Sequence, residues 1–263
     1  MTATKPTMLA DLVAAAARQT MRRRREWPEA EVERRAATAP RPRDLAAALS
    51  EPGLAVIAEM KPRSPLRGPL TEVYQPAALA RAYQSGGADA VSVLTHEEGF
   101  GGSPEHIAIV RAETDLPILR KDFIIEEYQV LEARSLGADA VLLIVAALGA
   151  ERLAELMNCT RRLGMEALVE VHDADEVDAA LSVGARVIGI NHRNLWNFEI
   201  DMTLTARLRD RIGGHRVIVA ESGVGSAADA RRLQDTGADA VLVGEMLMRS
   251  HDPEETVREL RLA

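Results

Sequence analysis

Acidic and basic side chains stand at the ends of short aliphatic segments, where a strand with a purely structural role would not need them. Glu59 and Lys61 close the first segment, and their spacing directs both side chains to the same face of a strand. Lys121 and Glu170 end two later segments. Burial lowers the pKa of a lysine and raises that of a glutamate, which favours proton-transfer chemistry near neutral pH. A structural network of ion pairs remains the alternative.

Two glycine-containing segments near the end of the chain predict an anion site. They supply Ser222 and Gly223 after the seventh aliphatic segment, and Gly244 and Glu245 after the eighth. Glycine lets the backbone approach an anion closely, and N–H groups at a helix start carry partial positive charge, so a phosphate fits. A tight turn without a ligand is one alternative. A dinucleotide site is the other, because residues 223–228 match a loose G-x-G-x-x-A pattern.

Aromatic residues are scarce, at 3% of the chain, and the three phenylalanines follow aliphatic segments: Phe100, Phe123 and Phe198. Rings that are missing from the core but present at strand ends favour a planar aromatic substrate, with Phe100 and Phe123 as binding residues. The alternative is that each ring anchors its own loop.

Eight aliphatic segments alternate with stretches of helical spacing, such as 77–84, 127–135, 150–163 and 227–236. The segments are 54–60, 90–94, 117–120, 140–145, 167–171, 187–190, 217–220 and 240–243. The sequence Gly-Ala-Asp-Ala-Val recurs at 87–91, 137–141 and 237–241, where a left-handed glycine ends a helix and a strand begins. Eight such units in about 250 residues predict a TIM (β/α)8 barrel, whose strand ends meet at one mouth. An open doubly wound sheet is the alternative.

Residues 1–50 precede the first strand and predict an N-terminal helical extension. A helix is expected over residues 8–25, and Asp44 can cap a short helix that ends near Ser50. The basic run at 22–25 is interpreted as a solvated face. Because no low-complexity linker divides the chain, we expect a single domain, with the barrel over residues 51–263.

Composition narrows the classes of function. A net charge of −8 argues against nucleic acid as the main partner. No apolar stretch approaches the ~20 residues of a membrane span, and no secretory signal is visible. The single cysteine, Cys159, is expected to be a packing residue and favours the cytoplasm. His96, His172 and His192 follow strands without the close spacing of metal ligands, so we expect neither a metal nor a cofactor.

Six motifs in strand order resemble the indole-3-glycerol-phosphate synthase family, over nearly the whole chain. They are Ile57–Pro65, Ser92–Thr95 with Phe100–Ser103, Leu119–Phe123, Leu168–Val171, Gly189–Leu195 and Ala220–Gly223. The resemblance implies a barrel enzyme of tryptophan biosynthesis that closes, decarboxylates and dehydrates 1-(2-carboxyphenylamino)-1-deoxyribulose 5-phosphate. Its partner would be this small phosphorylated aromatic substrate, and transient contacts with other enzymes of the pathway are compatible with it.

The resemblance also implies roles for individual residues. Lys121 would be the general acid that protonates the substrate ketone, with Glu170 as its carboxylate partner. Glu59 and Asn191 would assist dehydration, and Lys61 would attract anionic groups, including the phosphate. The division of acid and base roles among the charged residues stays open. The remaining substrate-binding residues are Arg193 and Ser64 for the ring carboxylate, Glu221 at the seventh strand end, and Ser222, Gly223, Gly244 and Glu245 at the phosphate.

The first βα loop departs from the family pattern. Leu66 stands where the family usually has a second serine, and Pro62 occupies a position that is often basic or polar. A ligand-binding paralogue without activity is therefore one alternative. A phosphoribosylanthranilate isomerase is another, but it would require a cysteine and aspartate pair, and no cysteine lies at a strand end. A dehydrogenase, which nicotinamide binding would reveal, is the third.

Overall fold

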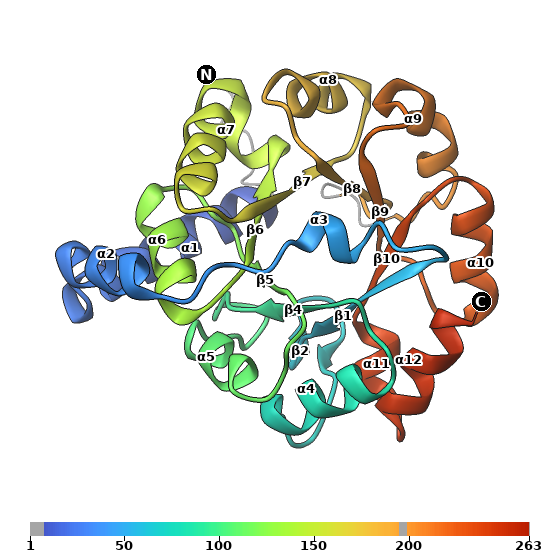
Figure 1. Ribbon diagram of the computed structural model, residues 1–263, viewed down its shortest axis with the longest axis horizontal. Helices are drawn as coiled ribbons and strands as arrows, with labels where there is room; N and C mark the ends of the chain where they lie inside the picture. Colours follow the sequence, from blue (N-terminus) through green and yellow to red (C-terminus); the bar gives the residue numbers. More distant parts are fainter. Residues whose placement is uncertain (1–7, 195–198, 263) are drawn as a thin grey trace.

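The computed structural model describes residues 8–194 and 199–262, and its centre is a closed barrel of parallel strands (Figure 1). In chain order the barrel strands are β1 (Ala55–Met60), β4 (Ala90–Leu94), β5 (Ile118–Lys121), β6 (Ala140–Ile144), β7 (Glu166–Val171), β8 (Val187–Asn191), β9 (Val217–Glu221) and β10 (Ala240–Val243). β10 pairs with β1 in parallel and closes the ring. The predicted TIM barrel is confirmed, and the open doubly wound sheet is excluded.

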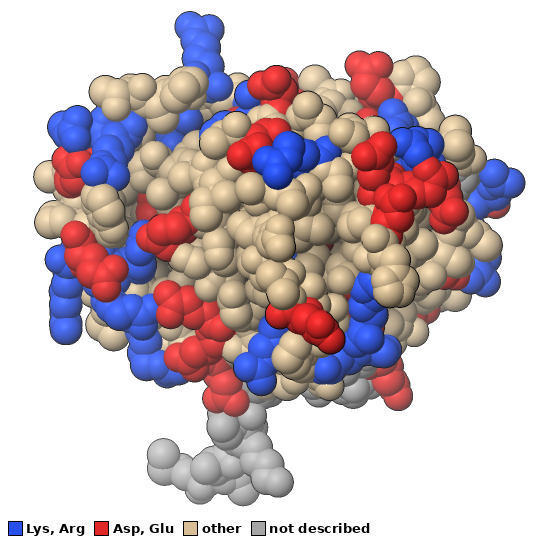
Figure 2. Space-filling model, turned by 90° about the horizontal axis from the view of Figure 1, so that it is seen from below, with Lys and Arg blue, Asp and Glu red and all other residues tan. Residues whose placement is uncertain are grey.

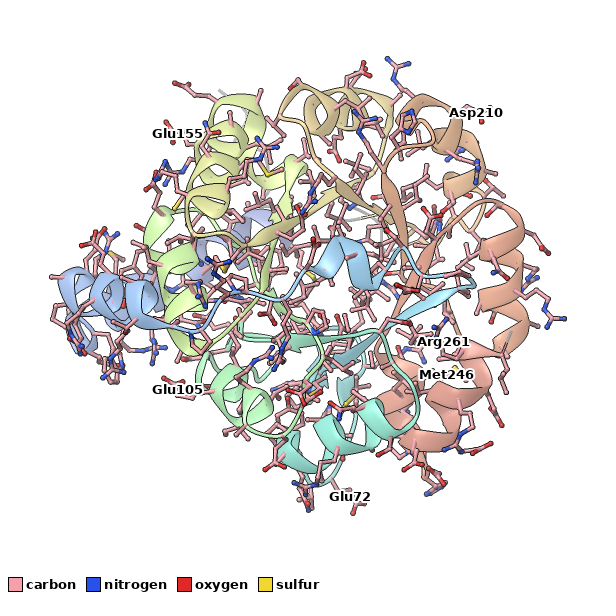
Figure 3. The ribbon with its side chains drawn as sticks, in the orientation of Figure 1. Glu72, Glu105, Glu155, Asp210, Met246 and Arg261 are labelled. Carbon is pink, nitrogen blue, oxygen red and sulfur yellow. The ribbon has the colours of Figure 1, made fainter. Side chains whose placement is uncertain are left out.

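Helices form a ring around the barrel (Figure 1). They are α4 (Pro76–Ser85), α5 (Glu105–Arg111), α6 (Glu127–Leu136), α7 (Val145–Arg162), α8 (Ala174–Ser182), α9 (Leu204–Ile212), α10 (Ala227–Asp235), α11 (Glu245–Arg249) and α12 (Pro253–Arg261). Exposed side chains such as Glu155 and Asp210 lie on the outer rim of this ring (Figure 3). α7 is interrupted at Gly149, whose φ of 69° and ψ of 171° are not helical, so a short turn after β6 precedes the helix predicted from residue 150.

Apolar side chains fill two layers on either side of the strands. Inside the barrel, Ile57, Leu119 and Leu168 pack together with Leu45 and Leu49 from the segment of α3 (Leu45–Ala48). The second layer lies between the strands and the surrounding helices. Strands buried on both faces are typical of parallel sheets, which explains why each aliphatic segment lacks polar alternation.

The repeated glycines have the predicted backbone conformation. Gly87, Gly137 and Gly237 have φ angles of 87°, 95° and 94°, in the left-handed region. Each therefore ends a helix at little steric cost and lets the chain turn into the next strand. This confirms the local interpretation of the repeat.

The N-terminal extension contains α1 (Met8–Glu26), α2 (Glu29–Thr38) and α3. The helix predicted over residues 8–25 is confirmed, and Asp44 caps α3 by accepting a hydrogen bond from the backbone N–H of Ala47. The sequence did not predict α2, which packs against α6. Figure 1 shows α1 beside the barrel and α2 projecting from the left edge.

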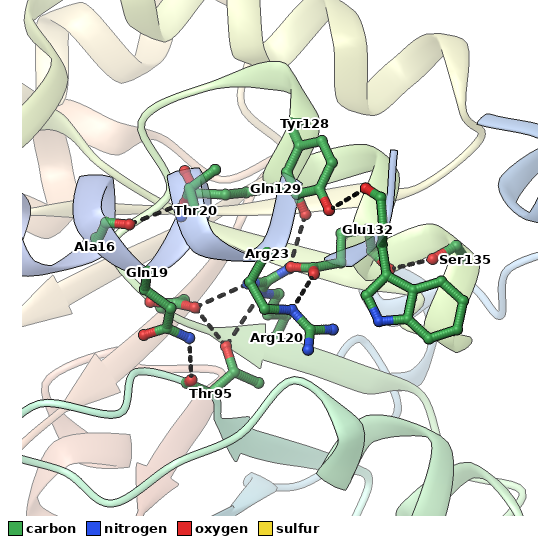
Figure 4. A network of polar contacts seen from close by, with 12 residues as sticks. Ala16, Gln19, Thr20, Arg23, Thr95, Arg120, Tyr128, Gln129, Glu132 and Ser135 are labelled. Atoms are coloured by element: carbon green, nitrogen blue, oxygen red, sulfur yellow. Dashed lines mark hydrogen bonds and ion pairs between the residues drawn. The ribbon is translucent and has the colours of Figure 1, made fainter. Parts of the chain in front are cut away.

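The basic run at residues 22–25 is not a solvated face throughout. Arg23 is buried, and its Nε donates a 2.8 Å hydrogen bond to Oε1 of buried Glu132 in α6. The other Glu132 oxygen accepts from buried Arg120 of β5, so α1 is joined to the barrel through a buried polar network (Figure 4). The interpretation was wrong for Arg23 because the helix docks with this side facing α6.

Acidic and basic side chains are interspersed on the face seen in Figure 2. Among the helices of the described residues, none is both long and apolar enough to cross a membrane. Cys159 is buried in α7, as expected for a packing residue.

Candidate active site

A cavity of about 700 Å³ opens at the carboxyl ends of the barrel strands. The structure brings every residue that the sequence proposed for the site to the wall of this cavity. These residues are Glu59, Lys61, Ser64, Phe100, Lys121, Phe123, Glu170, Asn191, Arg193, Glu221, Ser222, Gly223, Gly244 and Glu245. They come from different strands and loops, because parallel strands present all their carboxyl ends at one mouth.

Lys121 lies at the centre of a buried charge cluster. Its Nζ donates a 2.8 Å hydrogen bond to Oε2 of Glu221 and lies 3.6 Å from Oε2 of Glu170. Glu59 contributes a further negative charge to the environment of this lysine. An ammonium held among three carboxylates is a fixed proton carrier that faces the cavity.

The electrostatics of Lys121 correct the expectation of a lowered pKa. Burial alone favours the neutral amine, but the carboxylates of Glu221, Glu170 and Glu59 outweigh burial and raise the pKa of Lys121 above its ordinary value. The expectation considered burial alone, whereas the ion-pair partners of Lys121 within 4 Å are the carboxylates of Glu170 and Glu221. Lys121 is therefore held as an ammonium ion.

The pKa of the buried Glu221 carboxyl is raised toward neutrality. Burial raises its pKa, Lys121 opposes that change, and Glu170 adds to it, so the pKa of Glu221 is raised to about 7. Among the described residues, Oε1 of Glu221 has no hydrogen-bond partner. The sequence assigned Glu221 only to substrate binding, and nothing in its spacing distinguishes it from Glu170. Its contact with Lys121 makes it a further candidate for acid–base chemistry.

Glu59 and Lys61 form a second charged pair, as their spacing predicted. Lys61 Nζ lies 2.6 Å from Oε1 of Glu59. Burial would raise the pKa of Glu59, but Lys61 and Lys121 outweigh it, so that pKa is lowered and the expectation of a raised value was wrong for this residue. A Cβ atom on Gly244 would clash with Oε1 of Glu59, so a larger residue at this position would displace the pair.

Asn191 connects the carboxylates to Ser222, at the predicted anion site. Its Nδ2 donates a 3.1 Å hydrogen bond to Oε1 of Glu170. Its Oδ1 accepts hydrogen bonds from Ser222 Oγ, at 2.9 Å, and from the backbone N–H of Arg193, at 3.0 Å. The side-chain amide is therefore fixed in orientation. Ser222 has a left-handed φ of 66°, an uncommon conformation for a residue with a side chain and one that often occurs at functional sites.

The aromatic side of the cavity is formed by Phe100 and Phe123, whose ring centroids lie 6.3 Å apart. The buried imidazole of His96 packs edge-on against both rings, at 5.9 and 5.1 Å between centroids. Phe198 lies outside the described residues. Apolar residues of α1, Met8, Leu9 and Leu12, also line the cavity and give the N-terminal extension a place in the site.

The sequence did not indicate two arginines that lie beside the predicted anion site. Arg67 and Arg249 line the cavity, and each Nε lies within 3.3 Å of Oε1 of Glu245. Glu245 begins α11, directly after Gly244. Its side chain thus holds two cations beside the predicted anion site. Arginines are common on protein surfaces, and nothing about the positions of Arg67 and Arg249 in the chain indicates that both would contact Glu245.

The first βα loop contains a two-stranded hairpin of β2 (Arg63–Ser64) and β3 (Gly68–Pro69). Ser64 lines the cavity, and Leu66, between the two strands, lines it too while remaining 50% exposed. The departure from the family pattern at Leu66 therefore lies at the rim of the cavity, outside the charge cluster.

The three histidines that follow strands have separate environments. His96 contacts Asp122, with Nδ1 and Oδ1 3.3 Å apart, and lowers the pKa of that carboxyl to about 2 together with Arg120 against the effect of burial. Nε2 of His192 lies 2.8 Å from Oγ1 of Thr205. His172 lies between the carboxylates of Glu170 and Glu176.

Comparisons with known proteins give matches over nearly the whole chain. The family model described as "Indole-3-glycerol phosphate synthase" matches residues 9–260. "Indole-3-glycerol phosphate synthase 2" of Streptomyces coelicolor is 66% identical over 96% of this chain and 98% of its own length. The synthase of Micrococcus luteus is 50% identical over 92% of each chain.

Two solved structures share the fold at low sequence identity. A thiamine phosphate pyrophosphorylase from Pyrococcus furiosus has a TM-score of 0.62 and 18% identity, over 83% of this chain and 96% of the other. A 3-hexulose-6-phosphate synthase from Salmonella typhimurium has a TM-score of 0.61 and 13% identity, over 80% and 97%. These two likenesses concern the barrel alone. Because the family model matches residues 9–260 and a relative is 66% identical over nearly the whole chain, the chain belongs to the indole-3-glycerol phosphate synthase family.

Proposed function

We propose that the protein converts 1-(2-carboxyphenylamino)-1-deoxyribulose 5-phosphate to indole-3-glycerol phosphate, with loss of carbon dioxide and water. The observation that carries the proposal is the convergence of Lys121, Glu170 and Glu221 in one cavity that also has an aromatic wall and a glycine-rich anion end. The substrate needs all three features, because it combines an anilino ring, a ketone that must be protonated and a phosphate.

Lys121 is the proposed general acid. As the ring carbon attacks the ketone, negative charge develops on the ketone oxygen, and an ammonium at this place donates its proton to it. The raised pKa of Lys121 keeps it charged until that moment. Glu221, with its pKa raised to about 7, and Glu170 are the proposed groups that exchange protons with it during ring closure and dehydration.

The second pair is proposed to act in dehydration. Lys61 is charge-paired with Glu59 and lies at the exposed side of the cluster, where it can reach the departing hydroxyl group or the phosphate. Asn191 is proposed to hold the substrate hydroxyl and amine groups, because its amide is already fixed by Glu170 and Ser222.

The substrate ends are assigned by charge and shape. Arg193 and Ser64 are the proposed carboxylate ligands, since a guanidinium can grip a planar carboxylate with two hydrogen bonds. Phe100 and Phe123 are the proposed ring contacts. The phosphate is assigned to backbone N–H groups of Ser222, Gly223, Gly244 and Glu245, with Lys61 adding positive charge.

A direct assay tests the function. The purified protein is incubated with the carboxyphenylamino-deoxyribulose phosphate, and the indole fluorescence of the product is followed. Steady turnover supports the proposal. Binding of this substrate without turnover would favour the ligand-binding paralogue, and the failure of both would exclude the proposed substrate.

We also propose where the protein is located in the cell and which enzymes it contacts. A cytoplasmic location fits Cys159, which is a free, buried thiol, because thiols persist in a reducing compartment. Transient contacts with other tryptophan-pathway enzymes are proposed from the family alone, and cross-linking in cell extracts would test them.

A further inference from the structure

His172 is placed between the charge cluster and the surface. It directly follows β7, and its Nε2 lies 3.5 Å from Oε1 of Glu170. On the other side of the ring, Nδ1 lies 3.0 Å from Oε2 of Glu176, in the first turn of α8. The same Glu176 oxygen accepts a 2.7 Å hydrogen bond from the backbone N–H of His172. An imidazole is thus held between two carboxylates.

The two ring nitrogens differ in their partners. Nδ1 is bound by Glu176, which fixes the ring, whereas Nε2 is buried and has no hydrogen-bond partner within the described part of the chain. Buried polar atoms without a partner are rare in folded proteins. Nε2 faces Oε1 of Glu170, and the other oxygen of this carboxylate, Oε2, lies 3.6 Å from Nζ of Lys121. Glu170 therefore lies between the imidazole and the lysine.

Glu176 and His172 are partly exposed to solvent, whereas Glu170 is buried. The side chains of Glu176 and His172 are 17% and 15% exposed, while that of Glu170 is 3% exposed. His172 is absent from the cavity wall formed by the described residues. A proton can therefore reach the imidazole from solvent without passing through the space that the substrate would fill.

The proposed reaction needs such a supply. The substrate carboxylate carries a negative charge and leaves as neutral carbon dioxide, and its electron pair stays on the ring carbon while the ring regains aromaticity. The ketone oxygen leaves as water and needs two protons. One comes from the substrate methylene carbon that becomes part of the indole, and the other must come from solvent. Each turnover thus consumes one proton.

We propose that His172, oriented by Glu176, supplies this proton to Glu170 from solvent. In the step, the imidazolium gives its Nε2 proton to Glu170, which passes a proton on to the Lys121 cluster, and the neutral imidazole takes up a proton from solvent. His172 acts through Glu170 and is a positioning residue. The inference rests on the proposed function.

The charges around the ring favour this role. The groups that face His172 are Glu176 from α8, Glu170 from its own strand and Glu221 from β9. Burial lowers the pKa of the imidazole, but the hydrogen bond to Glu176 and the charges of Glu170 and Glu221 outweigh burial and raise that pKa above its ordinary value. The ring is therefore protonated over a wider range of neutral pH than a free histidine. Transfer requires Nε2 and Oε1, now 3.5 Å apart, to approach to about 2.6–3.2 Å.

The test uses His172→Ala, with His215→Ala as the matched control because His215 is exposed and is not part of the cavity wall formed by the described residues. We expect His172→Ala to lower kcat by about tenfold to a hundredfold with KM nearly unchanged, since proton supply is separate from binding. At fixed pH, added imidazole should raise kcat of His172→Ala in proportion to its concentration. The unaltered protein and the control should show no such dependence.

Glu176→Gln provides a second, milder test that keeps an oxygen acceptor for the His172 backbone. Loss of the Glu176 charge lowers the pKa of the imidazole, so the fall of kcat at alkaline pH should begin at lower pH. Rescue by imidazole together with this shift supports the proposal. Normal kcat in His172→Ala, or a low kcat indifferent to imidazole, overturns it while leaving the proposed function intact. An unaltered protein without turnover would overturn both.

Discussion

Replacement of Lys121 by methionine removes the charge at the centre of the cavity and keeps the length of the side chain. Lys121 lies 2.8 Å from Glu221 and 3.6 Å from Glu170. With an effective dielectric constant of about 20, the Coulomb attraction over these distances is ~6 and ~5 kcal/mol. Desolvation of the buried ions offsets much of this, so Lys121→Met should lower the free energy of unfolding by about 3–5 kcal/mol, the usual cost of removing one partner of a buried pair.

The loss of stability should depend on pH. Without Lys121, the pKa of Glu221, already raised to about 7 from its ordinary 4.5, rises further. A carboxyl group whose pKa is higher in the folded state contributes stability below its unfolded pKa and loses it as pH rises through the folded value. Thermal unfolding should therefore show a larger deficit for Lys121→Met at about pH 8.5 than at about pH 5.

The same substitution should also lower turnover. A positioned general acid contributes about 10²–10⁴-fold, so kcat of Lys121→Met, followed by indole fluorescence, should decrease by that factor while substrate still binds. Lys121→Arg is the matched control: it keeps the ion pairs and much of the stability, but a guanidinium does not release its proton and should restore little kcat. Near-normal kcat in Lys121→Met would transfer the acid role to Lys61. An unfolding deficit that is equal at both pH values would refute the electrostatic reasoning.

Three further changes test other parts of the site. Gly244→Ala places a methyl group against Glu59 Oε1 and should reduce kcat with little change in melting temperature; normal kinetics would show that the pair moves aside freely. Arg193→Lys keeps the charge but loses the two-pronged grip on a carboxylate, so KM should rise, and an unchanged KM would place the carboxylate elsewhere. Arg23→Met leaves Glu132 without one buried partner and should lower the free energy of unfolding by about 3 kcal/mol in denaturant titrations, whereas an unaffected midpoint would show that α1 docks through apolar contacts alone.

The strands and the location of the site were predictable from the sequence. Each barrel strand begins and ends within about a residue of its predicted segment, because a strand buried on both faces requires a short, uninterrupted aliphatic run. Charged residues that end such runs must lie at the carboxyl mouth of the barrel, so Glu59, Lys121 and Glu170 could be grouped without coordinates.

The tertiary structure alone decided which charges are partners and how they titrate. Lys121 and Glu221 are 100 positions apart in the chain, and no periodicity indicates that Glu221, more than Glu170, hydrogen-bonds the lysine. The same holds for Arg23, which pairs with Glu132 across 109 positions. Within a run of four arginines, nothing in the sequence distinguishes Arg23 from its exposed neighbours. Coulomb energies vary with the inverse of distance, and desolvation depends on the whole environment of a group. Both quantities are fixed only when the barrel closes, and that is why the sequence located the charged residues of the cavity but gave the wrong direction for the pKa of Lys121.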